Sequence, residues 1–238
     1  MLSKRARHPN RFLAGALMIT GGLLIAPIPA ASAQPCPDVD VVFARGTGEP
    51  PGVGGVGQAF VDALRPQVGA RSLDVYPVNY QASSDFSDRL QFAQSVVDGI
   101  RDAGGHIEST AAQCPDTRIV LGGYSQGAAV AGFVTSASIP EGIPSDYVAF
   151  LPKPMPPEVA NHVAAVTFFG KPSTQWLQNY GAPTITIGPS YAPKTIDLCA
   201  PGDSICDGEA GGTPTLAHTE YPVNGMVGQA ADFAASHL

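Results

Sequence analysis

"LGGYSQGAAVAGF", residues 121–133, is the stretch that decides the fold of this chain. Ser125 stands between two glycines at the spacing G-x-S-x-G, after an apolar run and before small helix-forming residues. Gly123 and Gly127 suit a sharp strand-to-helix turn, because side chains there would collide as the backbone closes up. The turn would place Ser125 at the edge of a sheet and the next N–H groups at a helix N-terminus, where negative charge is favoured. The pattern predicts a nucleophilic serine; the alternative is a small residue at a tight turn.

Apolar patterns on both sides of this stretch predict strands that alternate with helices. We expect strands at 38–46, 73–80, 118–125, 162–170 and 194–202, and helices at 57–68, 85–113, 126–137 and about 223–236. The long helix has apolar residues at 90, 93, 96, 97 and 100, with Ser84 or Asp85 as its N-cap. The alternation predicts an α/β fold with a central, mostly parallel sheet flanked by helices on both faces. The proline-rich segment 139–161 is expected to be a surface loop that lines a site, or else a disordered insertion.

A serine hydroxyl is a weak nucleophile and needs a base. In parallel sheets the ligand site lies beyond the carboxyl ends of the strands, so a catalytic residue should follow a strand. Of the four histidines after residue 33, His218 lies in a Gly/Thr/Pro-rich loop between the last strand and the last helix. His218 is therefore the predicted base, and the alternative is an exposed loop histidine without a role.

The third group should orient the imidazole and stabilise its charged form. Asp203 follows the strand "KTIDLC" and lies between Cys199 and Cys206, whose disulfide would hold its carboxylate rigidly. Asp197 lies within the strand and Asp207 just outside the bridge. Asp203 is the predicted acid.

Acyl transfer also needs donors for the developing oxyanion. "ARGTGEP", residues 44–50, follows the first strand and places Thr47 at the same edge as Ser125. The backbone N–H and hydroxyl of Thr47 would join the N–H of Gln126, although an ordinary glycine-rich turn is equally compatible with the spacing.

The first 33 residues have the pattern of a secretory signal peptide. Four basic residues precede an apolar run at 12–28, and Ala31-Ser32-Ala33 is an A-x-A cleavage signal. An uncleaved membrane anchor is the alternative, but Pro27 and Pro29 end the apolar run early. Cleavage would leave 34–238 as one domain that is secreted, extracellular or associated with the cell envelope.

The charge of residues 34–238 argues against nucleic acid as a partner. This part has nine Lys/Arg and all 20 Asp/Glu, a formal charge of −11, and no basic cluster. It has no second apolar stretch long enough to span a bilayer. The expected partner is an ester or lipid substrate, and the sequence does not indicate an oligomeric state.

Four cysteines, at 36, 114, 199 and 206, indicate two disulfides in an exported chain. Of three possible pairings, proximity favours Cys199 with Cys206, and hence Cys36 with Cys114. No C-x-x-C motif is present and the histidines are scattered, so we expect no metal and no other cofactor.

One stretch suggests a different protein class. "GVGGVG", residues 52–57, matches the dinucleotide-binding pattern G-x-G-x-x-G and precedes a predicted helix, with Asp74 downstream. Pro50 and Pro51 separate it from the first strand, and Asp74 opens its strand rather than ending it. A soluble nicotinamide cofactor is also of little use to an exported protein.

Four motifs together, "FARGTGEP", "GYSQGAAV", "CAPGDSIC" and "AHTEYP", resemble the cutinase family of secreted serine esterases, most closely its mycobacterial branch. The similarity runs from about Cys36 to the C-terminus. It implies a small alpha/beta-hydrolase without a large lid, Ser125 as nucleophile, Asp203 as acid and His218 as base. It also implies Thr47 and Gln126 as oxyanion donors and the same two disulfides. Many fungal members have serine where this chain has Thr47, whose β-branch restricts χ1.

The predicted function is hydrolysis of short to medium acyl esters through a covalent acyl-enzyme. A phospholipase or an acetyl-xylan-type esterase is an alternative within the same chemistry. A secreted surface-binding or antigenic protein with a decayed hydrolase site is the alternative from another class. "DYVAFLPKPMPP", residues 146–157, and the loop around Leu216 are candidates for receiving an acyl chain.

Overall fold

The computed structural model describes residues 35–208 and 213–238, so the predicted signal peptide lies outside the described residues. The strands β1 (Val39–Ala44), β2 (Leu73–Pro77), β3 (Arg118–Tyr124), β4 (Val163–Phe169) and β5 (Thr195–Leu198) form one sheet. Their order is β2-β1-β3-β4-β5, and every neighbouring pair is parallel. The predicted parallel sheet is confirmed, and its strands end at a common edge.

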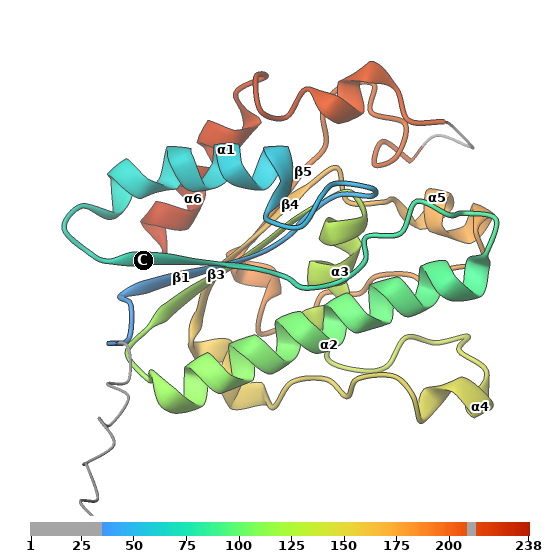
Figure 1. The fold of residues 1–238 in the computed structure, drawn as a ribbon, viewed down its shortest axis with the longest axis horizontal. Helices are drawn as coiled ribbons and strands as arrows, with labels where there is room; N and C mark the ends of the chain where they lie inside the picture. Colours follow the sequence, from blue (N-terminus) through green and yellow to red (C-terminus); the bar gives the residue numbers. More distant parts are fainter. Residues whose placement is uncertain (1–34, 209–212) are drawn as a thin grey trace, which may run out of the picture. The chain divides into compact units, whose positions relative to one another are not determined.

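Helices cover both faces of this sheet, as predicted (Figure 1). α1 (Gly54–Leu64) and α6 (Met226–Ser236) lie on one face, and α2 (Arg89–Gln113) and α3 (Gln126–Val134) on the other. The short helices α4 (Ser145–Val148) and α5 (Thr174–Asn179) lie in connections, and the sequence pattern did not predict them. Four 3-10 turns complete the described elements: η1 (Arg65–Val68), η2 (Pro157–Asn161), η3 (Ala192–Lys194) and η4 (Leu216–Thr219).

Two apolar cores lie on the two faces of the sheet. Successive residues of a strand point to opposite faces, so β4 directs Phe169 to the core beneath α1 and α6 and Phe168 to the core beneath α2 and α3. Both rings are fully buried. The largely apolar composition of β1, β3 and β4 follows from this burial on two sides.

The long helix begins later than predicted. Asp88 is its N-cap, and its carboxylate accepts a hydrogen bond from the N–H of Gln91 at 2.9 Å. Asp85 instead accepts from the N–H of Ser87 at 3.0 Å in the preceding turn. The predicted N-cap at Ser84 or Asp85 is therefore wrong, because Asp85 stabilises the approach to the helix rather than its first turn.

The side of α2 that packs on the sheet contains only part of the apolar spacing, because Val96 and Ile100 are partly buried against the core. Its buried residues are Ser95, Gly99, Ala103 and Ile107. A Cβ on Gly99 would lie 3.1 Å from Tyr80 and Val130, so small residues allow this close approach. Leu90, by contrast, is 65% exposed. Leu90 and Val97 are therefore free to line a cleft.

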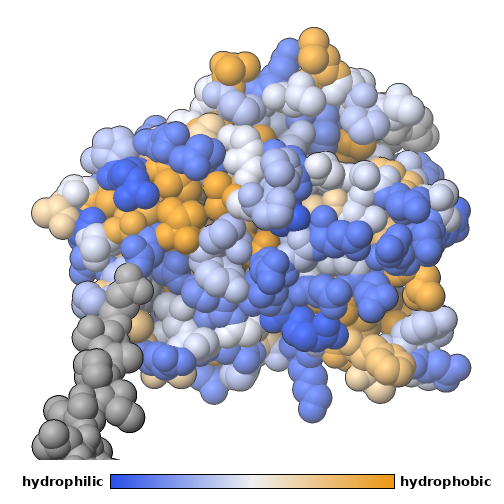
Figure 2. Space-filling view, viewed as in Figure 1, coloured by the Kyte–Doolittle hydropathy of each residue, from blue (hydrophilic) through white to orange (hydrophobic). Residues whose placement is uncertain are grey.

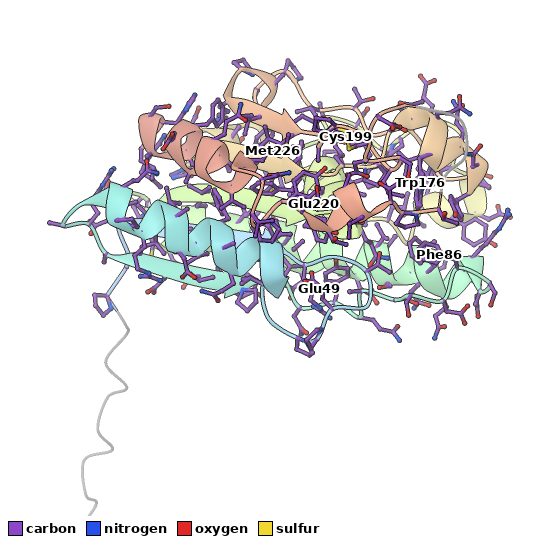
Figure 3. The ribbon with its side chains drawn as sticks, turned by 90° about the horizontal axis from the view of Figure 1, so that it is seen from above. Glu49, Phe86, Trp176, Cys199, Glu220 and Met226 are labelled. Atoms are coloured by element: carbon purple, nitrogen blue, oxygen red, sulfur yellow. A yellow bond between two sulfur atoms is a disulfide. The ribbon has the colours of Figure 1, made fainter. Side chains whose placement is uncertain are left out.

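The glycines at 52–57 have structural roles. A Cβ on Gly57 would lie 2.6 Å from the ring of Phe43, so only glycine allows α1 to pack this closely on β1. The carboxylate of Glu49, which lies beside the first turn of α1 (Figure 3), accepts from the N–H of Gly55 at 2.7 Å. The protein's own anion thus occupies the helix terminus that a dinucleotide phosphate would need.

Candidate active site

Ser125 lies in a tight turn between β3 and α3, with φ of 55°. A non-glycine residue at positive φ costs of order 1–3 kcal/mol and persists only where its surroundings enforce it. Here a Cβ on Gly123 would lie 2.2 Å from the carbonyl oxygen of Gly127, and a Cβ on Gly127 would lie 2.0 Å from that of Ala44. The two glycines are therefore required by backbone contact, as the sequence pattern predicted.

The Ser125 hydroxyl is hydrogen-bonded to the imidazole of His218, with 2.8 Å between Oγ and Nε2. The other ring nitrogen, Nδ1, lies 2.8 Å and 2.9 Å from the two carboxylate oxygens of Asp203. His218 is on η4, and Asp203 lies in the loop after β5. The three residues come from separate connections at the carboxyl edge of the sheet and form one hydrogen-bonded row.

The Asp203 carboxylate is fully buried. Burial by itself raises the pKa of Asp203, but hydrogen bonds from His218, Tyr221 and the N–H of Ile205 together hold this pKa below its usual value. The Tyr221 hydroxyl donates to Oδ2 at 2.6 Å, and the Ile205 N–H donates to Oδ1 at 3.0 Å. Asp203 is thus held as a carboxylate next to the imidazole.

Two disulfides join the cysteines in the predicted pairs, Cys36 with Cys114 and Cys199 with Cys206. The second closes the loop that contains Asp203. One of its two cysteines also contacts Tyr221, whose hydroxyl lies 3.5 Å from Sγ of Cys206. The disulfide loop and Tyr221 therefore both restrain the Asp203 carboxylate.

Tyr124 fixes the turn that bears His218. Its hydroxyl donates to the carbonyl oxygen of His218 at 2.6 Å, and the two rings lie 5.1 Å apart between centroids. Burial, together with the nearby carboxylates of Glu49 and Asp203, raises the pKa of Tyr124. The hydroxyl therefore stays protonated and keeps donating to the turn.

The turn containing Thr47 is held by a buried cation and a carboxylate. Arg45 is 4% exposed, and its guanidinium donates to the carbonyl oxygens of Glu49 at 2.8 Å and Tyr80 at 2.6 Å. The Glu49 carboxylate accepts from the N–H of Gly46 at 2.6 Å. These contacts fix the backbone on both sides of Thr47, which is half-buried and lines the same cleft as Ser125.

Gln126 is the first residue of α3, so its N–H has no acceptor within the helix. Its buried side chain donates through Nε2 to the carbonyl oxygen of Ser83 at 3.1 Å. The N–H of Gly48, next to Thr47, donates to the carbonyl oxygen of Ala82 at 2.7 Å. Residues 82–83 therefore tie together the two positions that the sequence predicts as oxyanion donors.

Ser125 and His218 open into a large cleft of about 1700 Å³ with a mostly apolar lining. At one end Phe86 and Trp176 lie edge to face, with 6.4 Å between ring centroids, and both side chains are seen at the same end of the molecule in Figure 3. Residues of segment 139–156 form another wall. The expectation that this proline-rich segment lines a site is therefore confirmed.

The family model for Cutinase matches residues 35–238. The chain belongs to the Cutinase family. A relative from Mycobacterium tuberculosis, the probable carboxylesterase Culp7, is 63% identical over 172 residues, which are 72% of this chain and 88% of that protein. Phospholipase Culp4 of the same organism is 45% identical over 227 residues, 95% of this chain and 88% of the relative.

A solved cutinase from Trichoderma reesei, in complex with a phosphonate inhibitor, has a TM-score of 0.60 and 33% identity to this chain. The match covers 85% of this chain and 77% of the solved one. Together with the parallel sheet and its flanking helices, this similarity shows an alpha/beta-hydrolase fold, and this member of the Cutinase family is an esterase.

The other histidines of this cutinase-family chain serve elsewhere. His106 on α2 contacts Asp40 at 2.7 Å and stacks on Tyr76. His162 precedes β4, and His237 follows α6 and packs on Phe233. Of the described histidines, His218 is the one hydrogen-bonded to Ser125.

Sequence reasoning missed Tyr221, Tyr124 and Arg45. The first lies within "AHTEYP" and the others within "GYSQGAAV" and "FARGTGEP", so the motifs contained them without indicating their contacts. Tyrosine and arginine are ordinary residues at such positions. Only the spatial approach of distant loops shows what their donors bind.

One group of described residues has the geometry of possible metal ligands, namely Cys199, Asp203 and Cys206. Both sulfurs are already joined in a disulfide, and a thiolate is what binds a metal. This group therefore does not fit a metal ion. In the described part of the chain, no helix is both long and apolar enough to cross a membrane.

Proposed function

We propose that this chain hydrolyses short to medium acyl esters through Ser125, His218 and Asp203. The observation that carries the proposal is the continuous row of hydrogen bonds from Ser125 through His218 to Asp203 at the wall of an apolar cleft. In this arrangement an imidazole held by a buried carboxylate can accept the proton of a serine hydroxyl.

The proposed reaction has two balanced halves. Ser125 Oγ bonds to the carbonyl carbon as its proton passes to Nε2 of His218 and the carbonyl π electrons move to oxygen. The carbonyl then re-forms as the C–O bond to the leaving group breaks, and His218 gives its proton to the departing oxygen, which leaves as the alcohol. Water repeats the sequence on the acyl-enzyme, which releases the carboxylic acid and restores Ser125. Asp203 stabilises the imidazolium in both halves.

The N–H groups of Gln126 and Thr47 are the proposed oxyanion donors, joined by the Thr47 hydroxyl. Three features support this assignment: the position of Gln126 at the helix N-terminus, the restrained turn around Thr47, and the hydrogen bonds of Gln126 and of Gly48, next to Thr47, to residues 82–83. Donors fixed before substrate binds need little reorganisation in the transition state.

A phospholipase activity is the second candidate. It is favoured by the apolar cleft and by the relative named Phospholipase Culp4. It uses the same acyl-transfer chemistry and differs in the leaving group. Release of fatty acid from phosphatidylcholine vesicles, compared with release from a simple ester of the same acyl chain, distinguishes the two.

A fluorophosphonate probe tests the mechanism directly. We expect the wild type to be labelled and to hydrolyse p-nitrophenyl butyrate, and Ser125→Ala to lose the label and at least about a thousandfold in kcat. Ser138→Ala is the matched control, because Ser138 lines the same cleft but lacks the contact with His218. Absence of wild-type labelling would support the decayed-site alternative, and equal labelling of Ser125→Ala would refute the nucleophile.

We also propose that the protein is exported and that residues 1–33 are removed. The two disulfides support this, since such bonds persist in oxidising compartments. Mass spectrometry of protein recovered from culture medium and cell envelope should find an N-terminus at Gln34. A product that still begins at Met1 contradicts cleavage.

A further inference from the structure

The cleft is larger than a short ester requires. Its volume of about 1700 Å³ exceeds the roughly 300–1,000 Å³ of typical small-molecule sites. One wall is the apolar side of α2, where Leu90, Ala93 and Val97 line the cleft without packing on the core beneath this helix. An apolar surface left open beside a catalytic serine suits an apolar part of the substrate.

The opposite wall is segment 138–156, which runs alongside α2 in Figure 1. The guanidinium of Arg101 donates to the carbonyl oxygen of Phe150 at 3.0 Å and thereby links this wall to α2. Tyr147 and Phe150 are 53% and 71% exposed at the rim. Figure 2 shows hydrophobic side chains at the lower right, between α4 and the N-terminal end of α2.

Hydrogen bonds place Ser125 relative to α2. The side chain of Gln126 binds Ser83, whose N–H donates to Oγ of Ser95 at 3.2 Å, so Ser95 lies level with the active site. Further along, Gly99 packs beside Val130 of α3, and a Cβ on Gly104 would lie 4.0 Å from Met155 of the opposite wall. From Ser95 toward Gly104, α2 therefore runs beside α3 and away from Ser125.

The distance along α2 from Ser95 to Gly104 sets the length of acyl chain that fits in the cleft. From Ser95 to Gly104, α2 advances about 13.5 Å at about 1.5 Å per residue. An extended hydrocarbon advances about 1.25 Å per carbon, given C–C bonds of about 1.5 Å at near-tetrahedral angles. The space from Ser95 to Gly104, here named the acyl arm, therefore matches a chain of about ten or eleven carbons.

We propose that the acyl arm binds a long acyl chain, so that lipid esters with ten or more acyl carbons are preferred over acetyl esters. This rests on the proposed function and extends it beyond short and medium chains. The charged pair Asp98 and Arg101 does not oppose it, because the two side chains are about half exposed at the rim and bonded to each other at 2.7 Å. Each methylene buried in the arm should improve kcat/KM by up to about fourfold.

Gly104→Leu tests the acyl arm by filling its far end. The helix tolerates this change, because leucine is a better helix former than glycine and a Cβ there meets nothing closer than Met155 at 4.0 Å. Gly228→Leu is the matched control: it makes the same change within α6, on the opposite face of the sheet, where a Cβ meets nothing within 4 Å.

The measurements are kcat/KM for p-nitrophenyl butyrate and palmitate, and binding of a fluorescent long-chain fatty acid, parinaric acid. We expect Gly104→Leu to lower the palmitate-to-butyrate ratio and the fatty-acid affinity at least tenfold, and Gly228→Leu to leave both unchanged. A wild-type preference for butyrate, or an unchanged ratio in Gly104→Leu, overturns the acyl arm while leaving the esterase mechanism standing. If the wild type hydrolyses neither ester, the proposed function fails, and the fatty-acid titration still decides whether the arm binds acyl chains.

Discussion

Replacement of Tyr221 by phenylalanine tests how the buried Asp203 carboxylate is stabilised. Tyr221 is fully buried, and its hydroxyl donates to Oδ2 of Asp203 at 2.6 Å and accepts from the N–H of Ala200 at 3.1 Å. The change removes one oxygen atom. It leaves the carboxylate with donors from His218 and Ile205, and it leaves the N–H of Ala200 without this acceptor.

The expected cost follows from these two contacts. A hydrogen bond to a charged group contributes about 1.5–3 kcal/mol, and an unsatisfied buried N–H costs about 1–3 kcal/mol. Because the two effects share one hydroxyl, they do not add fully. We expect a loss of about 3 kcal/mol in the free energy of unfolding, or about 6–12 °C in Tm for a domain of this size.

The pH dependence should change as well. The folded pKa of Asp203 is lowered, so its contribution to stability is present above about pH 3.9 and is lost as the pH falls through the folded pKa. Without the Tyr221 donor, burial is opposed by fewer hydrogen bonds, and the folded pKa rises. Acid unfolding of Tyr221→Phe should therefore begin at a higher pH than in the wild type.

The assay is urea and thermal unfolding of the disulfide-intact protein from pH 3 to pH 7, together with esterase activity at each pH. Tyr191→Phe is the control, because the Tyr191 hydroxyl is also buried but has no hydrogen-bond partner in the described part of the chain. Its removal should leave the free energy of unfolding unchanged or raise it, because a buried hydroxyl without a partner carries a desolvation cost. Equal stability of the two variants, or an unchanged acid transition in Tyr221→Phe, would refute the role assigned to the Tyr221 hydroxyl.

Two further predictions concern the tight turn at Ser125 and the disulfide between Cys36 and Cys114. Gly127→Ala should abolish activity and either lower Tm by more than 10 °C or prevent soluble expression, because the new Cβ would lie 2.0 Å from the carbonyl oxygen of Ala44. A stable and active variant would contradict this contact. Replacing Cys36 and Cys114 by serine should destabilise the protein by about 4.5 kcal/mol on the chain-entropy model. The kcat at 25 °C should stay within twofold of the wild-type value, because the bridge lies at the opposite end of the strands from Ser125. A large loss of kcat in folded protein would refute that separation.

The fold was predictable because its signals are local. The three central strands β1, β3 and β4 are short, largely apolar runs, and the turn at Ser125 needs glycines that no other residue can replace. The alternation of strands and helices then restricts the topology to a covered parallel sheet. The start of the long helix could not be predicted in the same way, since Asp85 and Asp88 are both good caps and only the path of the chain selects between them.

The candidate site was predictable to the extent that chemistry restricts residue type. Few histidines and acids follow a strand, so Ser125, His218 and Asp203 could be selected by position alone. The supporting contacts could not be predicted, because a tyrosine hydroxyl or an arginine can bind any nearby acceptor. Tyr221 and Arg45 acquire their partners only when loops far apart in the chain meet.

The sequence by itself determined the parallel sheet and the glycine-flanked turn, favoured the observed disulfide pairs, and selected the residues proposed for acyl transfer, because each depends on residue type and local spacing. The tertiary structure alone decided which side of α2 packs on the sheet and which lines the cleft. A helical pattern shows that apolar residues share a side, but not what covers that side. Here small residues at Ser95, Gly99 and Ala103 bring α2 close to the core, and the larger side chains at Leu90 and Val97 are left to form the cleft beside Ser125.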